Sequence, residues 1–356
     1  MRRSTILKVF IALFAVMFMI TATPALAGKV LLKVPICFPT ALPGMGTTAP
    51  WLAQRIEALS NGQIKMKVYE PGKLVAPFEI LDAVSKGKVN AGYSTPGYWQ
   101  GKIPAASLFS AVPFGPEAGE YLAWIYHGGG SELWQEMYDK AGYNVKVLPF
   151  GIIAPETSGW FQKPIESVAD LKGLRMRFFG LGGQAMQKLG VSTSLLPGGE
   201  IFPALEKGAI DATEFSMPAI DQRLGLYKIA KYNYFPGWHQ QATVFELLIN
   251  KDVWNKMTEH QKMVLEVGTR AATLDAFAMT EAIQGPVIKE NVTKRGVKNM
   301  YWSDEMLASF KKAWEEVVAE QAEDPMFKKV YDHMNAFRED YKYWSERGFL
   351  PRGSKK

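Results

Sequence analysis

The sequence predicts an α/β protein with two related lobes, each built on a mixed, mainly parallel sheet covered by helices. The main observation is an internal repeat, in which EILDAVSKGKVNAGY (Glu79–Tyr93) and EIFPALEKGAIDATE (Glu200–Glu214) match at a constant offset of 121 residues. Each copy is typical of a helix that ends at a glycine and is followed by a short strand. A further strand precedes each copy, IKMKVY in the first and VSTSLL in the second. Each unit is therefore a βαβ element, which favours parallel strands.

The first 27 residues are typical of a secretory signal peptide. Three basic residues (Arg2, Arg3 and Lys8) precede the apolar run VFIALFAVMFMI, and the small residues ALA follow at positions 25–27. The apolar run of 12 residues is shorter than the roughly 20 that a membrane-spanning helix needs. We therefore expect an exported protein.

Composition narrows the classes of function. Without positions 1–27 the chain has 38 basic and 35 acidic residues, and this weak net charge argues against a nucleic-acid partner. The one cysteine, Cys37, permits neither an intramolecular disulfide nor a thiolate metal cluster. The four histidines are scattered without an HExxH motif, which argues against a zinc site. The segment HGGG at 127–130 has no GxSxG partner, so an esterase is disfavoured.

The remaining elements follow from periodicity and caps. VLLKVPICF (30–38) predicts the opening strand, and TTAPWLAQRIEALSNGQ (47–63) an amphipathic helix that stops at Gly62. SVADLKG (167–173) predicts a capped turn, and 257–283 a long helix. The segment 303–347 reads as helical with a kink at Asp324-Pro325. Its aromatic face suits either packing within the chain or a subunit contact.

The stretch GLRMRFFGLGGQAMQKLG (173–190) reads as a strand, a glycine-rich turn and a helix. Gly180, Gly182 and Ala185 match the dinucleotide-binding pattern GxGxxG/A. However, that pattern follows a strand buried on both faces, whereas Arg175 and Arg177 point to one side of this strand. The acidic residue at the expected spacing, Glu200, lies in the first turn of a helix rather than at a strand end. We therefore reject the dinucleotide interpretation.

Arg177 is better explained as a residue that holds an anion. It lies nearer the carboxyl end of its strand than Arg175, and ligands of α/β proteins bind at that edge. A guanidinium can hold a carboxylate through two parallel hydrogen bonds. A surface ion pair is the alternative. Residues just after the repeats, such as Tyr98, Glu214 and Phe215, are expected at the same cleft.

Three stretches resemble the solute-binding proteins of TRAP (tripartite ATP-independent periplasmic) transporters, and are most similar to the branch that binds 2-oxo acids. They are SGWFQKPIESVADLKGLRMRFFGLGGQAMQKLG, PGGEIFPALEKGAIDATEF and KYNYFPGWHQQATVFELLINKDVW. The resemblance spans about 29–343. It implies a two-lobed periplasmic binding-protein fold, a location in the periplasm, a small organic carboxylate as ligand, and TRAP membrane subunits as partners.

The resemblance also implies site residues. Arg177 matches the arginine that grips the substrate carboxylate, and Glu214 with the backbone carbonyl of Phe215 matches a cation site for Na⁺ or Ca²⁺. Glu156 and Gln240 occupy two further cation positions, where the branch has glutamine and glutamate respectively; Phe215 replaces a tryptophan. Together with Tyr98, these residues are expected to bind the substrate. All the cation ligands would be oxygens, as hard cations prefer.

The resulting expectation is a non-catalytic receptor for a 2-oxo or 2-hydroxy monocarboxylate such as pyruvate or lactate. The alternatives are a receptor for an aromatic carboxylate, a dicarboxylate or a sugar acid, and an exported α/β enzyme. Lobe I is expected at 28–153 plus 242–283, and lobe II at 154–241 plus 284–302. The C-terminal segment 303–347 is expected to mediate a homodimer, with or without exchange of helices.

Overall fold

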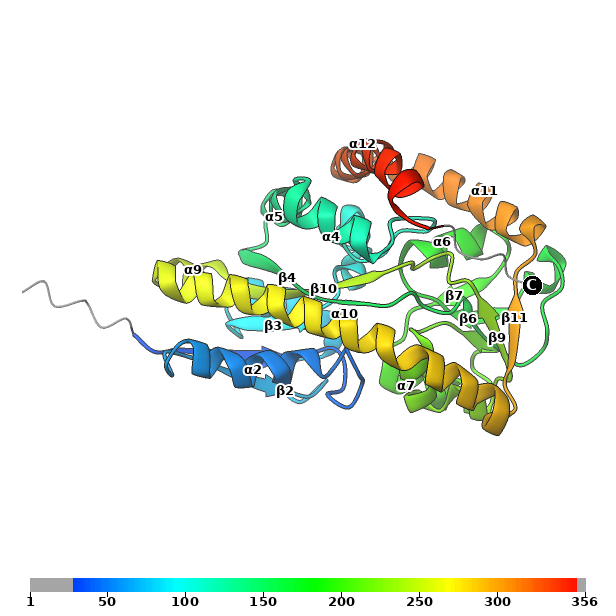
Figure 1. Ribbon diagram of the computed structural model, residues 1–356, viewed down its shortest axis with the longest axis horizontal. Coiled ribbons are helices and arrows are strands. Elements are labelled where there is room, and N and C mark those ends of the chain that lie inside the picture. The colour runs from blue at the N-terminus through cyan, green and yellow to red at the C-terminus, as the bar shows by residue number, and fades with distance from the viewer. Residues whose placement is uncertain (1–27, 351–356) are drawn as a thin grey trace, which may run out of the picture.

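The computed structural model describes residues 28–350, and the signal peptide expected at 1–27 lies outside the described residues. The strands form two groups, joined by the short segments 154–158 and 236–242 and by the long helix at 259–295 (Figure 1). Lobe I contains β1–β4 and β10, and lobe II contains β5–β9 and β11. The expected two-lobed α/β fold is confirmed.

Lobe I has a parallel pair and an antiparallel three-stranded sheet. Its strands are β1 (Val30–Pro35), β2 (Ile64–Tyr69), β3 (Ala91–Ser94), β4 (Val145–Ile153) and β10 (Thr243–Asn250). β1 pairs in parallel with β2, and β10 runs antiparallel between β3 and β4. A parallel bridge from Ile36 to Tyr93 connects the two sheets. All residues of β10 are buried, so this strand lies at the centre of the lobe I core.

Lobe II has one six-stranded sheet in the order β11-β9-β5-β8-β6-β7. Its strands are β5 (Gly159–Phe161), β6 (Arg175–Arg177), β7 (Ser192–Ser194), β8 (Ala212–Thr213), β9 (Tyr232–Phe235) and β11 (Lys298–Tyr301). β6 is parallel to both β7 and β8, whereas β5 is antiparallel to β8 and β9. The carboxyl ends of β6 and β8 therefore lie at the same edge of the sheet.

Helices cover these sheets. The α-helices are α2 (Thr48–Leu59), α3 (Ile80–Ser85), α4 (Ala118–His127), α5 (Gly130–Lys140), α6 (Gly180–Lys188), α7 (Gly198–Glu206), α8 (Pro218–Leu224), α9 (Lys251–Asn255), α10 (Glu259–Arg295), α11 (Asp304–Gln321) and α12 (Pro325–Gly348). Short 3₁₀ helices are η1 (Pro77–Glu79), η2 (Pro96–Trp99), η3 (Pro104–Phe109), η4 (Val168–Leu171) and η5 (Leu226–Lys228). The capped turn expected at 167–173 is η4, with Ser167 and Asp170 forming a capping box.

The internal repeat corresponds to a repeated structure. Helices α3 and α7 are each followed by a glycine in the left-handed region, Gly87 at φ +69° and Gly208 at φ +67°. In each lobe the strands before and after this helix flank a third strand, β1 in lobe I and β6 in lobe II. The strand β6 that carries Arg177 is thus the counterpart of the opening strand.

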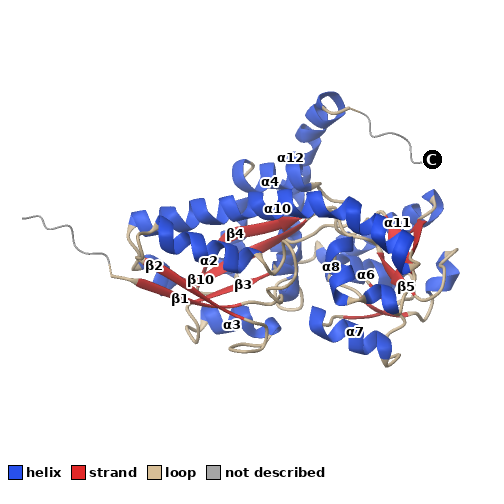
Figure 2. Ribbon diagram, turned by 60° about the horizontal axis from the view of Figure 1, so that its bottom comes forward, coloured by secondary structure: helices blue, strands red, loops and turns tan. Residues whose placement is uncertain are grey.

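The helix α10 runs along both lobes (Figures 1 and 2). It begins at a capping box between Thr258 and Gln261 and ends at Gly296, which has φ +69°. It extends to Arg295, 12 residues beyond the expected end at Ile283, because Pro286 is accommodated inside the helix. One continuous helix therefore crosses the position where the sequence analysis placed the boundary between lobes.

The C-terminal segment is helical with a break at the expected position. Asp324 caps α12 by accepting a hydrogen bond from the Phe327 amide at 2.7 Å, and Pro325 occupies the first helical position. α11 packs on α6 of lobe II, whereas α12 packs on η3 and α4 of lobe I. Much of the aromatic face is buried within this chain, since Phe310 and Phe327 are both 0% exposed.

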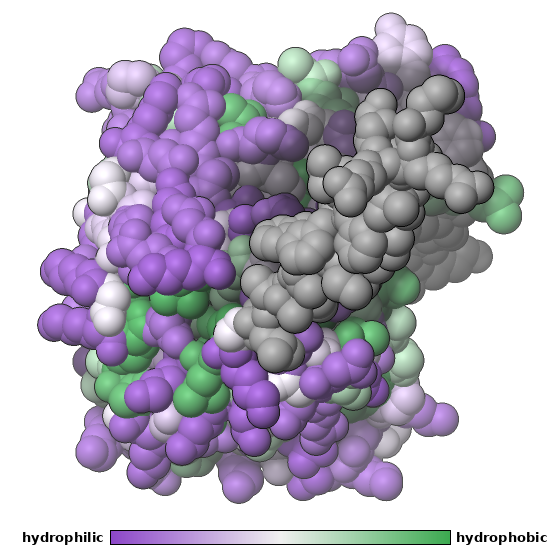
Figure 3. All heavy atoms as spheres, turned by 90° about the vertical axis from the view of Figure 1, so that its left-hand side faces the viewer, coloured by the Kyte–Doolittle hydropathy of each residue, from purple (hydrophilic) through white to green (hydrophobic). Residues whose placement is uncertain are grey.

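Within positions 28–350, no helix combines the length and apolar character that a membrane span requires. Figure 3 views the end of the molecule that lies at the left of Figure 1. Its visible surface is mostly hydrophilic, with hydrophobic residues in small groups. The buried hydrophobic side chains form one cluster that extends through both lobes and under the C-terminal helices.

Candidate functional site

The two arginines of β6 have different environments. Arg175 is exposed and forms an ion pair with Asp211, with Nη2 2.6 Å from Oδ1. Arg177 is 1% exposed and lies at the carboxyl end of the strand, beside the connection between the lobes. Alternation along the strand would place both side chains on one face, but Arg177 alone is enclosed by residues of both lobes, which include Tyr98 and Phe215.

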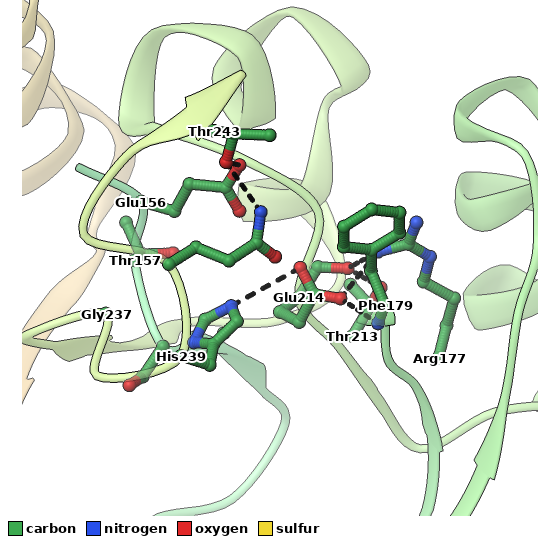
Figure 4. A network of polar contacts seen from close by, with 12 residues as sticks. Glu156, Thr157, Arg177, Phe179, Thr213, Glu214, Gly237, His239 and Thr243 are labelled. Carbon is green, nitrogen blue, oxygen red and sulfur yellow. Dashed lines mark hydrogen bonds and ion pairs between the residues drawn. The ribbon is translucent and has the colours of Figure 1, made fainter. Parts of the chain in front are cut away.

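Arg177 makes hydrogen bonds with only part of its guanidinium. Its Nη1 donates to the Glu214 carbonyl at 2.8 Å and to Glu214 Oε1 at 2.7 Å, and its Nε donates to the Leu196 carbonyl at 3.2 Å (Figure 4). Its Nη2 has no acceptor among the residues that the structure describes. The guanidinium carbon lies 5.1 Å from the centre of the Phe215 ring. The guanidinium is thus held in place through Nη1 and Nε, and its Nη2 can donate to a ligand.

Glu214 follows β8 and is 0% exposed. Its Oε1 accepts hydrogen bonds from Arg177 and from the Phe179 amide. Its Oε2 has no donor within the described part of the chain and lies 3.6 Å from His239 Nε2. Burial by itself would raise the pKa of Glu214, but Arg177 and His239 together lower it below its usual value. The carboxylate is therefore ionised and keeps one oxygen available.

A second polar group connects Glu156, Gln240 and Thr243. The Thr243 hydroxyl donates to Glu156 Oε1 at 3.0 Å and accepts from Gln240 Nε2 at 2.7 Å. The Glu156 amide also donates to the Gln240 carbonyl at 3.2 Å. Both Glu156 Oε2 and Gln240 Oε1 are buried with no donor in the described residues. Burial, followed by the charge of Glu214, raises the pKa of Glu156 well above its usual value.

His239 belongs to this site although the sequence analysis did not assign it there. Ligand atoms of Glu156, Glu214 and His239 lie within 4.8 Å of one another, and Figure 4 shows the imidazole directed at Glu214. A Cβ at Gly182 of the glycine-rich stretch would lie 2.7 Å from the His239 Cβ. That glycine therefore allows α6 to approach the imidazole. The available signal was the position of His239 directly before Gln240.

Asp221 on α8 was also missed. It is 0% exposed and accepts a hydrogen bond from Trp160 Nε1 at 2.7 Å, whereas its Oδ1 lacks a donor in the described chain. Burial raises its pKa well above the usual value, despite the Trp160 hydrogen bond. Nothing in the sequence around PAIDQRL marks it, because its place beside β5 is set by tertiary packing.

Between the two lobes lies a small cavity, with about 240 Å³ of space that no atom fills, part of which is open to solvent. It is lined by Phe38, Met45, Thr95, Tyr98, Glu156, Arg177, Phe179, Phe215, Gln240, Thr243 and Phe245. Five of the six residues expected to bind substrate line this cavity, and the sixth, Glu214, contacts Arg177. The Tyr98 hydroxyl is buried with no partner among residues 28–350. The structure thus brings all six expected residues together.

Comparisons with known proteins agree with this arrangement. The model of the family "Bacterial extracellular solute-binding protein, family 7" matches residues 42–324. A monocarboxylate 2-oxoacid-binding periplasmic protein of Nostoc sp. (strain PCC 7120) is 38% identical over 298 residues, which cover 83% of this chain and 81% of that protein.

Two solved structures have the same fold throughout. A TRAP transporter solute-binding protein from Bordetella bronchiseptica RB50 is 31% identical with a TM-score of 0.87, covers 90% of this chain and 94% of its own, and is described as a mixed-occupancy dimer with calcium and picolinate. A TRAP periplasmic solute-binding protein from Pseudoalteromonas atlantica T6c, with bound sodium and pyruvate, is 30% identical with a TM-score of 0.85, covering 89% of this chain and 96% of its own. The chain therefore belongs to bacterial extracellular solute-binding protein family 7 and is a periplasmic solute-binding protein of the TRAP type.

Proposed function

We propose that this protein captures a small 2-oxo or 2-hydroxy monocarboxylate, such as pyruvate or lactate, together with a metal cation. The protein would release this ligand unchanged to TRAP membrane subunits rather than catalyse a reaction. The observation that carries the proposal is a buried group at one small cavity, in which Arg177 forms hydrogen bonds through Nη1 and Nε but not Nη2, and Glu156, Gln240 and the adjoining Glu214 each have an oxygen without a donor among the described residues.

Arg177 would hold the carboxylate of the solute. Its Nη1 and Nε are fixed by Glu214 and Leu196, so the guanidinium cannot rotate away. A buried, charge-assisted pair of this kind is short and strong because no water competes for the donors. The aromatic face of Phe215 beside the guanidinium adds a favourable cation–π contact.

Glu156 Oε2, Glu214 Oε2 and Gln240 Oε1 would hold the cation, with the Phe215 carbonyl as a further candidate ligand. All are oxygens, which suits Ca²⁺ or Na⁺. Leaving these buried oxygens unpaired is unfavourable, and a cation would satisfy them together. When bound, the cation would also chelate the carboxylate and the 2-oxo or 2-hydroxy oxygen of the solute. Relatives with calcium and picolinate, sodium and pyruvate, and calcium and pyruvate support this assignment.

Burial and the charge of Glu214 raise the pKa of Glu156, and a bound cation would hold this carboxylate ionised. With a solute at −1, Arg177 at +1 and both glutamates ionised around the cation, these groups sum to −2. Ca²⁺ would neutralise this charge, whereas Na⁺ would leave a charge of −1, so the balance favours Ca²⁺ slightly. Asp221 is left out of this sum because it does not line the cavity, and burial raises its pKa well above the usual value.

Much of the rest of the cavity wall is apolar. Phe38, Met45, Phe179, Phe215 and Phe245 line it, together with the polar side chains of Thr95 and Tyr98. Among the lining residues, Arg177 is the one cationic side chain. A second carboxylate would therefore lack a cationic partner, which disfavours a dicarboxylate, and the largely apolar wall offers few partners for the several hydroxyls of a sugar acid. An aromatic carboxylate is the second candidate, because the wall is aromatic and the Bordetella relative is described with picolinate.

We assign residues 28–153 plus 242–283 to lobe I, residues 154–241 plus 284–302 to lobe II, and residues 1–27 to a signal peptide that export removes. The strand pairing supports the assignment, because β1–β4 and β10 pair with each other and not with β5–β9 and β11. The boundary in α10 lies inside a continuous helix, so α10 would act as a spine between the lobes.

We also propose that the protein forms a homodimer through the end of α12. Side chains there are exposed although they are large and apolar: Tyr343 at 71%, Trp344 at 59%, Phe349 at 60% and Leu350 at 93%. The dimer could form with α12 exchanged between subunits or simply in contact. The relative from Bordetella, described as a dimer, supports the proposal.

Mass spectrometry of the ligand extracted from freshly purified protein tests the proposed function. We expect a small monocarboxylate with a 2-oxo or 2-hydroxy group, recovered unchanged after incubation with the protein. Recovery of a dicarboxylate or sugar acid, or conversion of the added acid into a product, would contradict the proposal.

A further inference from the structure

Phe179 of lobe II is packed against a glycine of lobe I. It lies between β6 and α6, and its ring is 6% exposed and lines the cavity. Gly97 lies opposite it in η2, and a Cβ added there would be 2.2 Å from the Phe179 Cζ, with two further ring atoms within 3.0 Å. The ring also meets Tyr98 edge-on, with centroids 5.7 Å apart. Thus the ring occupies the space that any other residue at 97 would need.

The backbone of Phe179 is tied to the charged part of the site. Its amide donates a hydrogen bond to Glu214 Oε1, the oxygen that also pairs with Arg177 (Figure 4). Glu214 of lobe II therefore holds the backbone of Phe179, whereas Gly97 and Tyr98 of lobe I contact its ring. A single residue connects the ion-binding groups, the cavity wall and the contact between lobes.

We propose that the contact between Phe179 and Gly97 holds the lobes closed over the solute, and that the Phe179 ring sets the size limit for the solute's tail. This inference rests on the proposed function, because it assumes that the cavity holds the solute. The ring closes the apolar side of the cavity, where the tail of a monocarboxylate would lie. The contact forms only when the lobes meet, since its two sides belong to different lobes.

Lack of space for a side chain, and not backbone conformation, explains why position 97 is a glycine. The φ angle of Gly97 is outside the left-handed region, so its backbone can carry any side chain. In the closed form, however, a methyl group at 97 would overlap the ring, and the ring could yield only by moving into the cavity or by separating the lobes. Both movements disfavour the closed, ligand-bound form and leave an open form unaffected.

The test compares Gly97→Ala with Gly101→Ala. Gly101 lies in the same segment, is exposed, and has nothing within 4 Å of an added Cβ. Calorimetric titration with pyruvate in the presence of Ca²⁺ should show about tenfold or greater weakening for Gly97→Ala, the scale expected of overpacking, and no change for Gly101→Ala. Thermal unfolding of the ligand-free proteins should be nearly the same, because the overlap exists only in the closed form.

A second substitution at Phe179 tests whether Gly97→Ala weakens binding through this contact or through a general loss of structure. Phe179→Leu removes the ring atoms that would meet a Cβ at 97, so adding it to Gly97→Ala should restore most of the affinity. Phe179→Leu alone replaces the ring with a smaller side chain and so leaves more room for the tail of the solute. It should raise the preference for 4-methyl-2-oxopentanoate over pyruvate by about fivefold, which is the size of effect that one or two additional methylene groups have in a hydrophobic pocket. It should also release solute faster.

Several outcomes would overturn the inference. They are normal binding by Gly97→Ala, absence of rescue in the double variant, and an unchanged ratio of affinities in Phe179→Leu. These outcomes leave the proposed function standing, since the unsubstituted protein would still bind pyruvate. If the unsubstituted protein and Gly101→Ala both fail to bind any 2-oxo acid, the proposed function itself is wrong.

Discussion

Arg177 and Glu214 form a fully buried ion pair, with Nη1 2.7 Å from Oε1, although Glu214 Oε2 has no donor among the described residues and the hydrogen bonds of Arg177 are made by Nη1 and Nε, not by Nη2. A buried pair that served stability alone would be expected to satisfy its own hydrogen bonds, because unpaired buried groups are unfavourable. Here the unused donor and the unused acceptor carry opposite charge. The pair can therefore bind an anion on one side and a cation on the other.

The first prediction compares the two arginines of β6. Arg177→Ala should weaken solute binding by about 2–5 kcal/mol, part of which reflects the unpaired charge left on Glu214. Arg175→Ala should have a much smaller effect, since Arg175 pairs with Asp211 at the surface. Calorimetric titration of both variants measures the difference. Equal losses would show that Arg177 does not contact the solute.

The second prediction concerns Glu156 and Gln240. If one cation contacts both, Glu156→Gln should weaken cation and solute binding together, and adding Gln240→Glu should restore much of the loss, because one carboxylate is again present. In a double-mutant cycle the coupling should exceed about 1 kcal/mol, as for residues that share a partner. Simple additivity would mean that the two side chains do not share an ion.

A control is needed because Thr243 connects these side chains directly. The same cycle can be measured on the free energy of unfolding in chelator-treated protein. There the coupling should be clearly smaller than in the binding measurement. Equal couplings in the two measurements would attribute the effect to Thr243 and not to a cation.

The third prediction uses a buried carboxylate outside the site. Glu246 on β10 accepts hydrogen bonds from Trp99 Nε1 and the Tyr138 hydroxyl, both at 2.7 Å. Burial raises its pKa from 4.5 to about 7, against the effect of these hydrogen bonds. Because the folded protein holds this proton more tightly than the unfolded chain, Glu246 adds stability below pH 4.5 that is lost as the pH rises through 7.

Urea unfolding between pH 4.5 and 8 should therefore show a loss of stability that Glu246→Gln reduces, since the amide cannot ionise. Glu316→Gln, at an exposed position of α11, should follow the unsubstituted protein throughout. Parallel pH profiles for Glu246→Gln and the unsubstituted protein would mean that Glu246 does not retain its proton in the folded state.

The fourth prediction concerns the C-terminal helices. Phe310 of α11 stacks on Trp238, beside His239, with centroids 4.7 Å apart. Truncation after Tyr301 should uncover this aromatic surface, lower solubility and weaken solute binding. The expected cause is the loss of packing within the chain. The aromatic pattern of the sequence did not distinguish such packing from a contact between subunits.

The dimer itself is tested at the exposed end of α12. Light scattering at micromolar concentration should give twice the mass of one chain, and Trp344→Ser combined with Leu350→Ser should lower it. Both side chains are more than half exposed in one chain, so folding should be unaffected. A single-chain mass for the unsubstituted protein would contradict the proposed homodimer.

Much of the fold could be predicted, because the repeat fixed the strand–helix–strand units and glycine caps ended the helices at Gly87 and Gly208. Arg177 and Glu214 could be placed at one edge, since Arg177 ends β6 and Glu214 follows the neighbouring parallel strand β8. His239 and Asp221 were missed because their place depends on tertiary packing, which joins loops and helices far apart in sequence. The full length of α10 was missed because the local pattern gave no reason to expect a proline inside it.

Calorimetric titration of pyruvate into protein stripped of metal, repeated after addition of Ca²⁺ and, separately, of Na⁺, measures whether solute binding requires a cation. The site needs a cation to offset Glu156 and Glu214 beside the incoming carboxylate, so we predict no measurable binding without a cation and binding with one equivalent per chain once a cation is present. Binding of equal strength in the stripped protein and after cation addition would contradict the account.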